Sequence, residues 1–110
     1  MAGQAGDKEV KIRKRQGRPE ADPPEVEVSR KGKVTWVLDA DAEDWAVLLD
    51  GKTPFVGKKG FFSGKGKGSS GGAKIDGNAV EKGERFKYWI VWRDAGGEVA
   101  YVDPRIMIYD

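Results

Sequence analysis

The chain has 110 residues, of which 38% are hydrophobic and 35% are charged, and its 20 basic residues nearly balance its 18 acidic ones. This length fits one domain, residues 1–110, with a modest core. The sequence has no Cys and no His, which excludes disulfide bonds, thiolate nucleophiles, imidazole bases and the common zinc and copper sites. No apolar run approaches the about 20 residues of a membrane-spanning helix, so we expect a soluble, cytoplasmic protein without a membrane partner.

Apolar residues that alternate with polar ones predict short β-strands along most of the chain. The expected strands lie, in chain order, around residues 10–12, 26–28, 34–38, 45–49, 86–92, 99–101 and 106–108. A helix is the alternative for residues 41–49, because the acidic residues at 41–44 suit a helix N-terminus; we favour a strand. Glycines and prolines separate the segments. The pattern predicts an all-β protein, an antiparallel Greek-key sandwich or barrel of seven to nine short strands.

Residues 57–73 differ from the rest of the chain, because glycine and lysine dominate their composition. Glycine at this density costs much conformational entropy when it is ordered. We therefore predict a mobile Gly/Lys-rich loop at about 57–73, centred on residues 64–72. The surrounding block of residues 52–75 carries six lysines and no acidic residue, whereas residues 19–51 carry nine acidic residues. Such alternating blocks of opposite charge are typical of a solvated surface, and the alternative is that they face one another within the fold or between molecules.

The order of several motifs resembles the cupredoxins, the plastocyanin-like Greek-key sandwiches. The motifs are GKVTW at 32–36, FFSG at 61–64, VEKGERF at 80–86 and IMI at 106–108. The resemblance covers about residues 25–110 and implies a cupredoxin-like fold. A blue-copper site needs two His and one Cys, and Asp44-Trp45 stands near the place of the first His of the family. The resemblance therefore implies a copper-free member, similar to cupredoxin-like bacterial domains, without a cofactor or an electron-transfer role.

The aromatic residues divide into core candidates and binding candidates. Trp36, Phe86, Tyr88 and Trp92 occupy inward strand positions and are expected in the core. Four of the other aromatic residues, together with two lysines of the glycine-rich segment, are the expected contacts with a protein partner or a second copy of the chain. These residues are Trp45, Phe61, Phe62, Trp89, Lys65 and Lys67. For Trp45 and Trp89, packing between the sheets is the alternative role.

Nucleic-acid binding is the alternative function, and a basic segment near the N-terminus would carry it. The residues of this segment are Lys11, Arg13, Lys14, Arg15 and Arg18, to which the Lys/Gly loop adds positive charge. However, Lys11 and Arg13 alternate with Val10 and Ile12, as on the solvent face of an ordinary strand. The acidic residues of 19–51 would also repel phosphate. We therefore favour a small, non-catalytic binding or structural module that meets a protein partner or a second copy of the chain.

Other motifs give weaker signals. GKGSSG at 66–71 fits the G-x-G-x-x-G pattern, but no helix is expected after it, as a dinucleotide site requires. The acidic residues between 39 and 50 resemble a calcium loop, but Asp44 stands where glycine is needed, so a solvated turn is favoured over a weak cation site. No arrangement of carboxylates, serines or lysines indicates a nucleophile or a general base. We therefore predict no catalytic residues, no metal and no enzyme activity.

Overall fold

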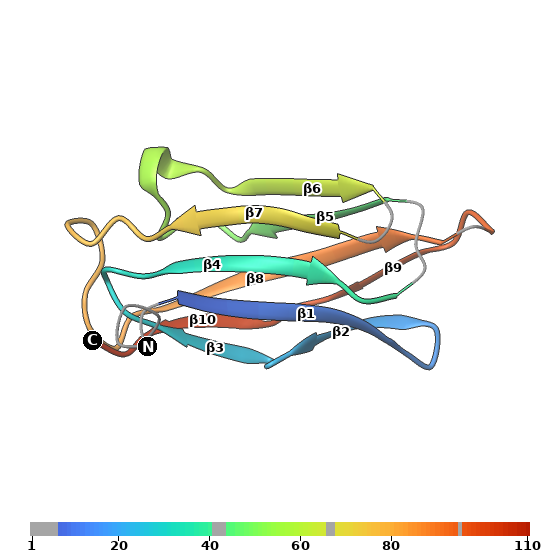
Figure 1. The fold of residues 1–110 in the computed structure, drawn as a ribbon, viewed down its shortest axis with the longest axis horizontal. Helices are drawn as coiled ribbons and strands as arrows, with labels where there is room; N and C mark the ends of the chain where they lie inside the picture. Colours follow the sequence, from blue (N-terminus) through green and yellow to red (C-terminus); the bar gives the residue numbers. More distant parts are fainter. Residues whose placement is uncertain (1–6, 41–43, 66–67, 95) are drawn as a thin grey trace.

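The protein folds into two β-sheets that pack face to face, as a computed structural model shows (Figure 1). The structure describes residues 7–40, 44–65, 68–94 and 96–110. The strands are β1 (Asp7–Arg15), β2 (Arg18–Asp22), β3 (Glu25–Val28), β4 (Lys33–Leu38), β5 (Asp44–Leu49), β6 (Phe61–Lys65), β7 (Gly68–Lys74), β8 (Arg85–Arg93), β9 (Val99–Val102) and β10 (Arg105–Ile108). The described part of the chain has no helix long and apolar enough to cross a membrane. The all-β prediction is confirmed.

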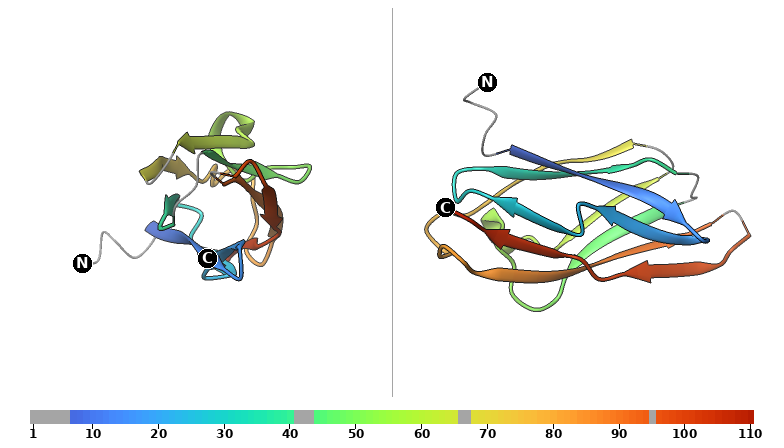
Figure 2. Two further views of the ribbon diagram at one scale, coloured as in Figure 1. Left: turned by 90° about the vertical axis from the view of Figure 1, so that its right-hand side faces the viewer. Right: turned by 90° about the horizontal axis from the view of Figure 1, so that it is seen from below.

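The first sheet has four strands and the second has six. The order of the first sheet is β2-β1-β4-β7, and the order of the second is β3-β10-β8-β5-β6, with β9 also paired to β8. The chain passes from the first sheet to the second between β2 and β3, at Pro23 and Pro24. An end-on view shows that the strands surround a common interior (Figure 2).

Each sheet contains one parallel pair of strands, so the prediction of a purely antiparallel sandwich is wrong. β1 runs parallel to β4, with Val10 opposite Trp36, and β3 runs parallel to β10, with Val26 opposite Ile106. Side chains alternate along a strand in the same way whether its neighbour is parallel or antiparallel. The local pattern therefore could not reveal the direction. The described residues also form ten strands rather than seven to nine.

The strands with regular alternation are confirmed. In β1, Val10 and Ile12 are buried while Lys11 and Arg13 are exposed. Residues 44–49 form strand β5 rather than a helix. In β9, Val99 and Tyr101 point outward, and the neighbouring Ala100 and Val102 pack against the core.

The glycine-rich segment is mostly strand, which corrects the prediction of a loop. β6 pairs with β5, and β7 pairs with β4; residues 66–67 lie outside the described residues. A short 3₁₀ turn at Val56–Lys58 leads into β6, and the Thr53 hydroxyl donates to the Lys59 carbonyl at 2.6 Å. The backbone hydrogen bonds of the two ladders offset the entropy lost when glycine is ordered. The mobility of this segment stays a prediction.

The core between the sheets is built around Trp36. Its side chain is fully buried, and its ring centroid lies 5.2 Å from that of Phe62, 5.5 Å from that of Tyr88 and 5.8 Å from that of Phe55. Rings from both sheets thus meet in one cluster. The core positions predicted for Trp36, Phe86, Tyr88 and Trp92 are confirmed, because all four are buried.

The turn before β8 is held by Glu84. Its carboxylate accepts hydrogen bonds from the Lys52 ammonium and from the backbone N–H of Glu81. These two hydrogen bonds hold the pKa of Glu84 below its ordinary value. The Lys52 ammonium also lies 5.7 Å from the ring centroid of Phe86. The turn therefore fixes the start of β8, the strand that contributes most aromatic residues to the core and the site.

Candidate functional site

The second sheet turns one face to the core and the other outward. We use the name outer face for ten of the outward-pointing side chains of β5, β6, β8 and β9, from which the exposed Arg85 and Lys87 of β8 are left out: Asp44, Ala46, Leu48, Phe61, Ser63, Trp89, Val91, Arg93, Val99 and Tyr101. Large apolar side chains are exposed on it, with exposed fractions of 66% for Val99, 54% for Phe61 and 52% for Tyr101. Scattered exposed apolar residues are ordinary, but a group on one face marks an interaction surface.

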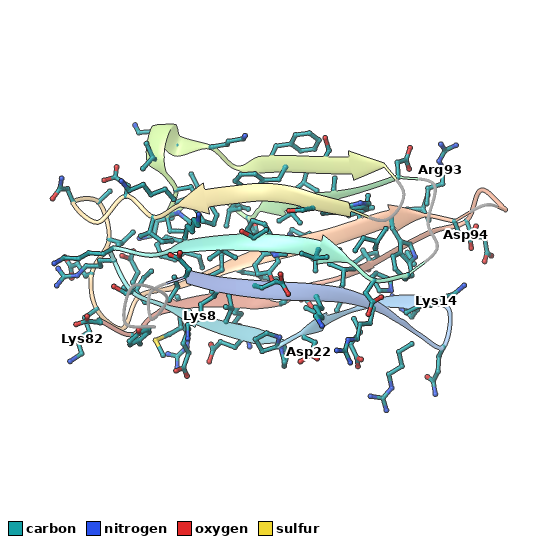
Figure 3. All side chains as sticks on the ribbon, viewed as in Figure 1. Lys8, Lys14, Asp22, Lys82, Arg93 and Asp94 are labelled. Carbon is teal, nitrogen blue, oxygen red and sulfur yellow. The ribbon has the colours of Figure 1, made fainter. Side chains whose placement is uncertain are left out.

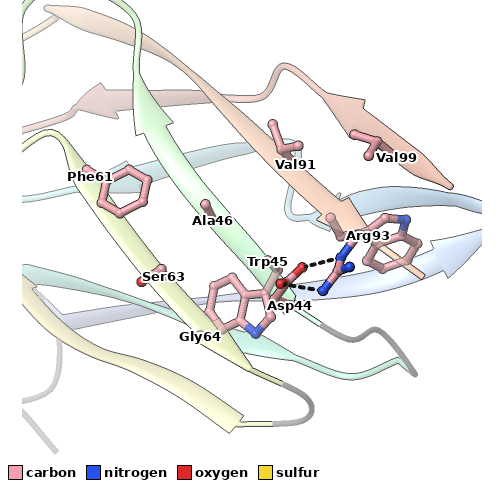
Figure 4. Close-up of a pocket in the computed structure, with 10 residues that line it drawn as sticks. Asp44, Trp45, Ala46, Phe61, Ser63, Gly64, Val91, Arg93 and Val99 are labelled. Carbon is pink, nitrogen blue, oxygen red and sulfur yellow. Dashed lines mark hydrogen bonds and ion pairs between the residues drawn. The ribbon is translucent and has the colours of Figure 1, made fainter. Parts of the chain in front are cut away.

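A pocket of about 600 Å³ opens on the outer face (Figure 4). The small residues Ala46 and Ser63 lie opposite each other on β5 and β6. The larger side chains of Phe61, Val91 and Val99 also line the pocket. Small residues between large ones leave a hollow, and its size suits a small apolar molecule or several side chains of a partner.

An ion pair stands at one end of the pocket. Asp44 and Arg93 are opposite each other on β5 and β8. Arg93 donates from Nε at 3.3 Å and from a terminal nitrogen at 3.1 Å to the two carboxylate oxygens of Asp44, as the dashed lines in Figure 4 show. This two-point geometry fixes both side chains. The charges of the pair cancel, so the pocket is suited to apolar contacts rather than to a strongly charged ligand.

Cations cover the aromatic residues beside the pocket. The Lys87 ammonium lies 4.6 Å from the ring centroid of Trp89 and 3.3 Å from a carboxylate oxygen of Asp103. Trp89 contacts Tyr101 with ring centroids 5.5 Å apart, and the Arg18 guanidinium lies 5.8 Å from the Tyr101 ring. Cation–π contacts of this kind stabilise exposed rings modestly. Because Lys87 occupies one face of Trp89, the open apolar surface is provided mainly by Phe61 and Val99.

In the structure, the predicted partner-binding residues divide between the outer face and the core. Phe61 is exposed and Trp89 is half-buried on the outer face, as a contact role requires. Trp45 and Phe62 are only 3% and 5% exposed and belong to the core, but Trp45 also contributes to the lining of the pocket. Lys65 ends β6, and Lys67 lies outside the described residues.

The sequence does contain a signal that Trp45 points inward. Trp45 has the same parity along β5 as the buried Val47, and this parity indicates an inward side chain. Three further residues of the site, Ala46, Val91 and Val99, were not predicted from the sequence. They are ordinary strand residues, and they form a site only because the register places them side by side.

The basic segment of β1 and β2 is engaged with acidic neighbours. Arg13 lies 3.3 Å from Asp22, and Arg15 lies 3.2 Å from Glu20, across the β1–β2 hairpin. Figure 3 shows Lys14 and Asp22 on these strands. Lys11 lies opposite Asp22 in the register, and Arg18 donates to the Tyr101 carbonyl at 3.3 Å. The basic segment and the acidic block thus meet within one hairpin, which reduces the attraction of this surface for phosphate.

Within the described residues, neither weak ligand motif shows the arrangement that its chemistry requires. Among the residues that the structure describes, no three acidic side chains lie close enough together to hold a metal ion; Asp41 and Glu43 lie outside them. The glycines at 68, 71 and 72 belong to strand β7, which leads to a bridge at Ile75 rather than to a helix. A dinucleotide site needs that helix.

We expect Gly64→Ala to destabilise the fold by about 1–3 kcal/mol. A Cβ at Gly64 would lie 2.7 Å from two ring atoms of the buried Trp45, so the indole would have to move. The matched control is Gly60→Ala, whose Cβ would meet Leu49 at an ordinary 3.8 Å. Urea denaturation of both variants measures the difference, and equal stabilities would contradict the close packing of Trp45 on β6.

Comparison of the chain with known protein families and with curated proteins found no match. The interpretation of the outer face therefore depends on its own geometry.

Proposed function

We propose that this protein is a non-catalytic binding module that attaches to a protein partner through its outer face. The observation that carries the proposal is the exposure of Phe61, Val99 and Tyr101 around an apolar pocket. Exposed aromatic and aliphatic side chains beside a pocket are the usual energetic centre of a protein contact. The Asp44–Arg93 pair at the end of the pocket supplies polar groups for the rim of such a contact.

We also propose that the fold is a copper-free, cupredoxin-like Greek-key sandwich. The two-sheet architecture supports this, as does the position of Trp36, which belongs to the GKVTW motif, in the core. The sequence has no His and no Cys to hold blue copper. In this proposal the scaffold serves as a rigid support for a binding face.

A protein partner accounts for the charges better than a nucleic acid does. Arg13 and Arg15 have acidic neighbours, and the open surface near the pocket is apolar. We therefore expect a fluorescently labelled oligonucleotide to show no strong binding at low salt. A tight complex whose affinity falls steeply between 50 and 200 mM salt would contradict the proposal and favour the nucleic-acid alternative.

The direct test is a photo-crosslinking amino acid in place of Phe61, with the same amino acid in place of Lys82 as the control. Lys82 lies at the opposite end of the long axis from Arg93 (Figure 3). In the native cell extract we expect a discrete protein adduct from position 61 and none from position 82. Adducts with a second copy of the chain would identify self-association. Equal labelling from both positions, or adducts with nucleic acid alone, would contradict the outer face as the binding surface.

A further inference from the structure

Strand β6 leaves alternate backbone groups open at the edge of the second sheet. Leu49 N–H donates to the Gly60 carbonyl at 2.8 Å, which makes these two residues a hydrogen-bonded pair. Hydrogen-bonded and non-bonded pairs alternate in an antiparallel ladder. Phe62 and Gly64 therefore direct their N–H and C=O groups to β5, and Phe61 and Ser63 direct theirs away from it. Among the described residues, no ladder joins β6 to any strand except β5.

The first four residues of this edge strand lack two features that usually prevent another strand from adding, and a lysine stands only at its end. Edge strands are commonly blunted by proline, by charged residues or by a covering segment. β2, at the edge of the first sheet, contains Pro19, and Pro23 follows it. In contrast, the first four residues of β6 are Phe, Phe, Ser and Gly, without charge or proline. Figure 1 shows β6 as the outermost strand on its side of the molecule.

The charge around β6 selects the kind of strand that would add. Residues 52–75 carry six lysines and no acidic residue, and one of the six, Lys52, is paired with Glu84. Lys58 and Lys59 are exposed just before β6, and the Lys59 ammonium lies 4.9 Å from the ring centroid of Phe62. A second copy paired along β6 would bring two such positive blocks together, which is unfavourable. An acidic segment would instead be attracted to this edge.

We propose that β6 binds an extended segment of the partner as an added β-strand, and that this segment has acidic residues on both sides of a neutral, apolar centre. Backbone hydrogen bonds to Phe61 and Ser63 provide the affinity, and alternate side chains extend the apolar surface beside Phe61. The inference rests on the proposed function, because Phe61 belongs both to the edge and to the pocket.

The test is an NMR titration of the ¹⁵N-labelled protein with the acetylated and amidated peptide Asp-Glu-Val-Thr-Val-Thr-Glu-Asp. We expect larger amide shifts at Phe61 and Ser63 than at Phe62 and Gly64, and an affinity that falls as salt is added. A peptide with lysine in place of every acidic residue should bind about tenfold more weakly or worse. Equal binding of the two peptides would overturn the acidic character of the partner segment.

Two further changes test the backbone hydrogen bonds. Ser63→Pro removes the open N–H and should abolish binding, whereas Ser63→Ala, which also loses the hydroxyl but keeps the N–H, should bind at least about tenfold more tightly than the proline variant. Should the proline variant not fold, N-methylation of alternate peptide residues provides the same test on the parent protein. N-methyl groups on the peptide residues whose N–H groups face β6 should abolish binding. N-methyl groups on the intervening residues should leave binding intact.

The outcomes separate this inference from the proposed function. Peptide binding that survives N-methylation in both registers, with shifts spread over β5 and β8, would overturn strand addition and leave the outer face as the binding surface. A protein crosslink from position 61 without binding of either peptide would likewise overturn strand addition and leave the outer face as the binding surface. The absence of a protein crosslink from position 61 would instead contradict the proposed function.

Discussion

Trp36→Ala is expected to lower the free energy of unfolding by about 3–5 kcal/mol, the usual cost of removing a fully buried large aromatic side chain. The indole is packed against Phe55, Phe62 and Tyr88 and therefore joins the two sheets. Its removal leaves a cavity where they meet. Because ordinary domains have a total stability of only about 5–15 kcal/mol, urea denaturation should show a large fall in the midpoint.

Phe61→Ala is the matched control for this prediction. Its ring is 54% exposed on the outer face, so its removal should cost less than about 1 kcal/mol. If the two variants lose the same stability, the core does not lie around Trp36. The small expected cost at position 61 also fits a side chain that is available for a partner.

Above pH 10 we expect the stability to fall by about 1.4 kcal/mol for each pH unit because of Tyr88 alone. Burial raises the pKa of the Tyr88 phenol far above its ordinary value, and contact with the Trp36 indole offsets part of this effect. Between about pH 10 and the raised pKa, the unfolded chain loses this proton while the folded protein keeps it. The unfolded state is therefore favoured as the pH rises, and below pH 10 this tyrosine gives no pH dependence.

Tyr88→Phe removes the hydroxyl group. Above pH 10, the free energy of unfolding of this variant should fall less steeply than that of the parent, by about 1.4 kcal/mol for each pH unit. Tyr101→Phe, at a tyrosine that is 52% exposed on the outer face, is the matched control for the loss of a hydroxyl group. Urea denaturation at a series of pH values from neutral to alkaline measures both. Identical alkaline slopes for the parent and Tyr88→Phe would contradict the burial of this hydroxyl.

Much of the fold could be predicted because several strands carry a clear apolar alternation. Val10 and Ile12, or Phe86 and Tyr88, identify a buried face without any knowledge of the neighbouring strand. The parallel pairs could not be predicted in this way, since the partner strands are far apart in the sequence. β7 could not be predicted either, because its glycines have low strand propensity and its conformation depends on pairing with β4.

The candidate site could be predicted only in part. Phe61 and Trp89 could be predicted as contact residues, because the chain has more aromatic residues than its core needs. The pocket depends on the alignment of Ala46, Ser63 and Val91 across three strands, and register is a tertiary property. The open backbone groups of β6 are not encoded in any motif, because they result from its position at the edge of the sheet.

Amide hydrogen exchange of β6, followed by NMR, is the most direct test of the strand on which the account of binding depends. We predict that the amides of Phe62 and Gly64, which donate to β5, are protected, and that those of Phe61 and Ser63 exchange rapidly. Rapid exchange at all four positions would contradict the strand and restore the mobile loop. Protection at all four would show that the edge is already covered and unable to accept a partner.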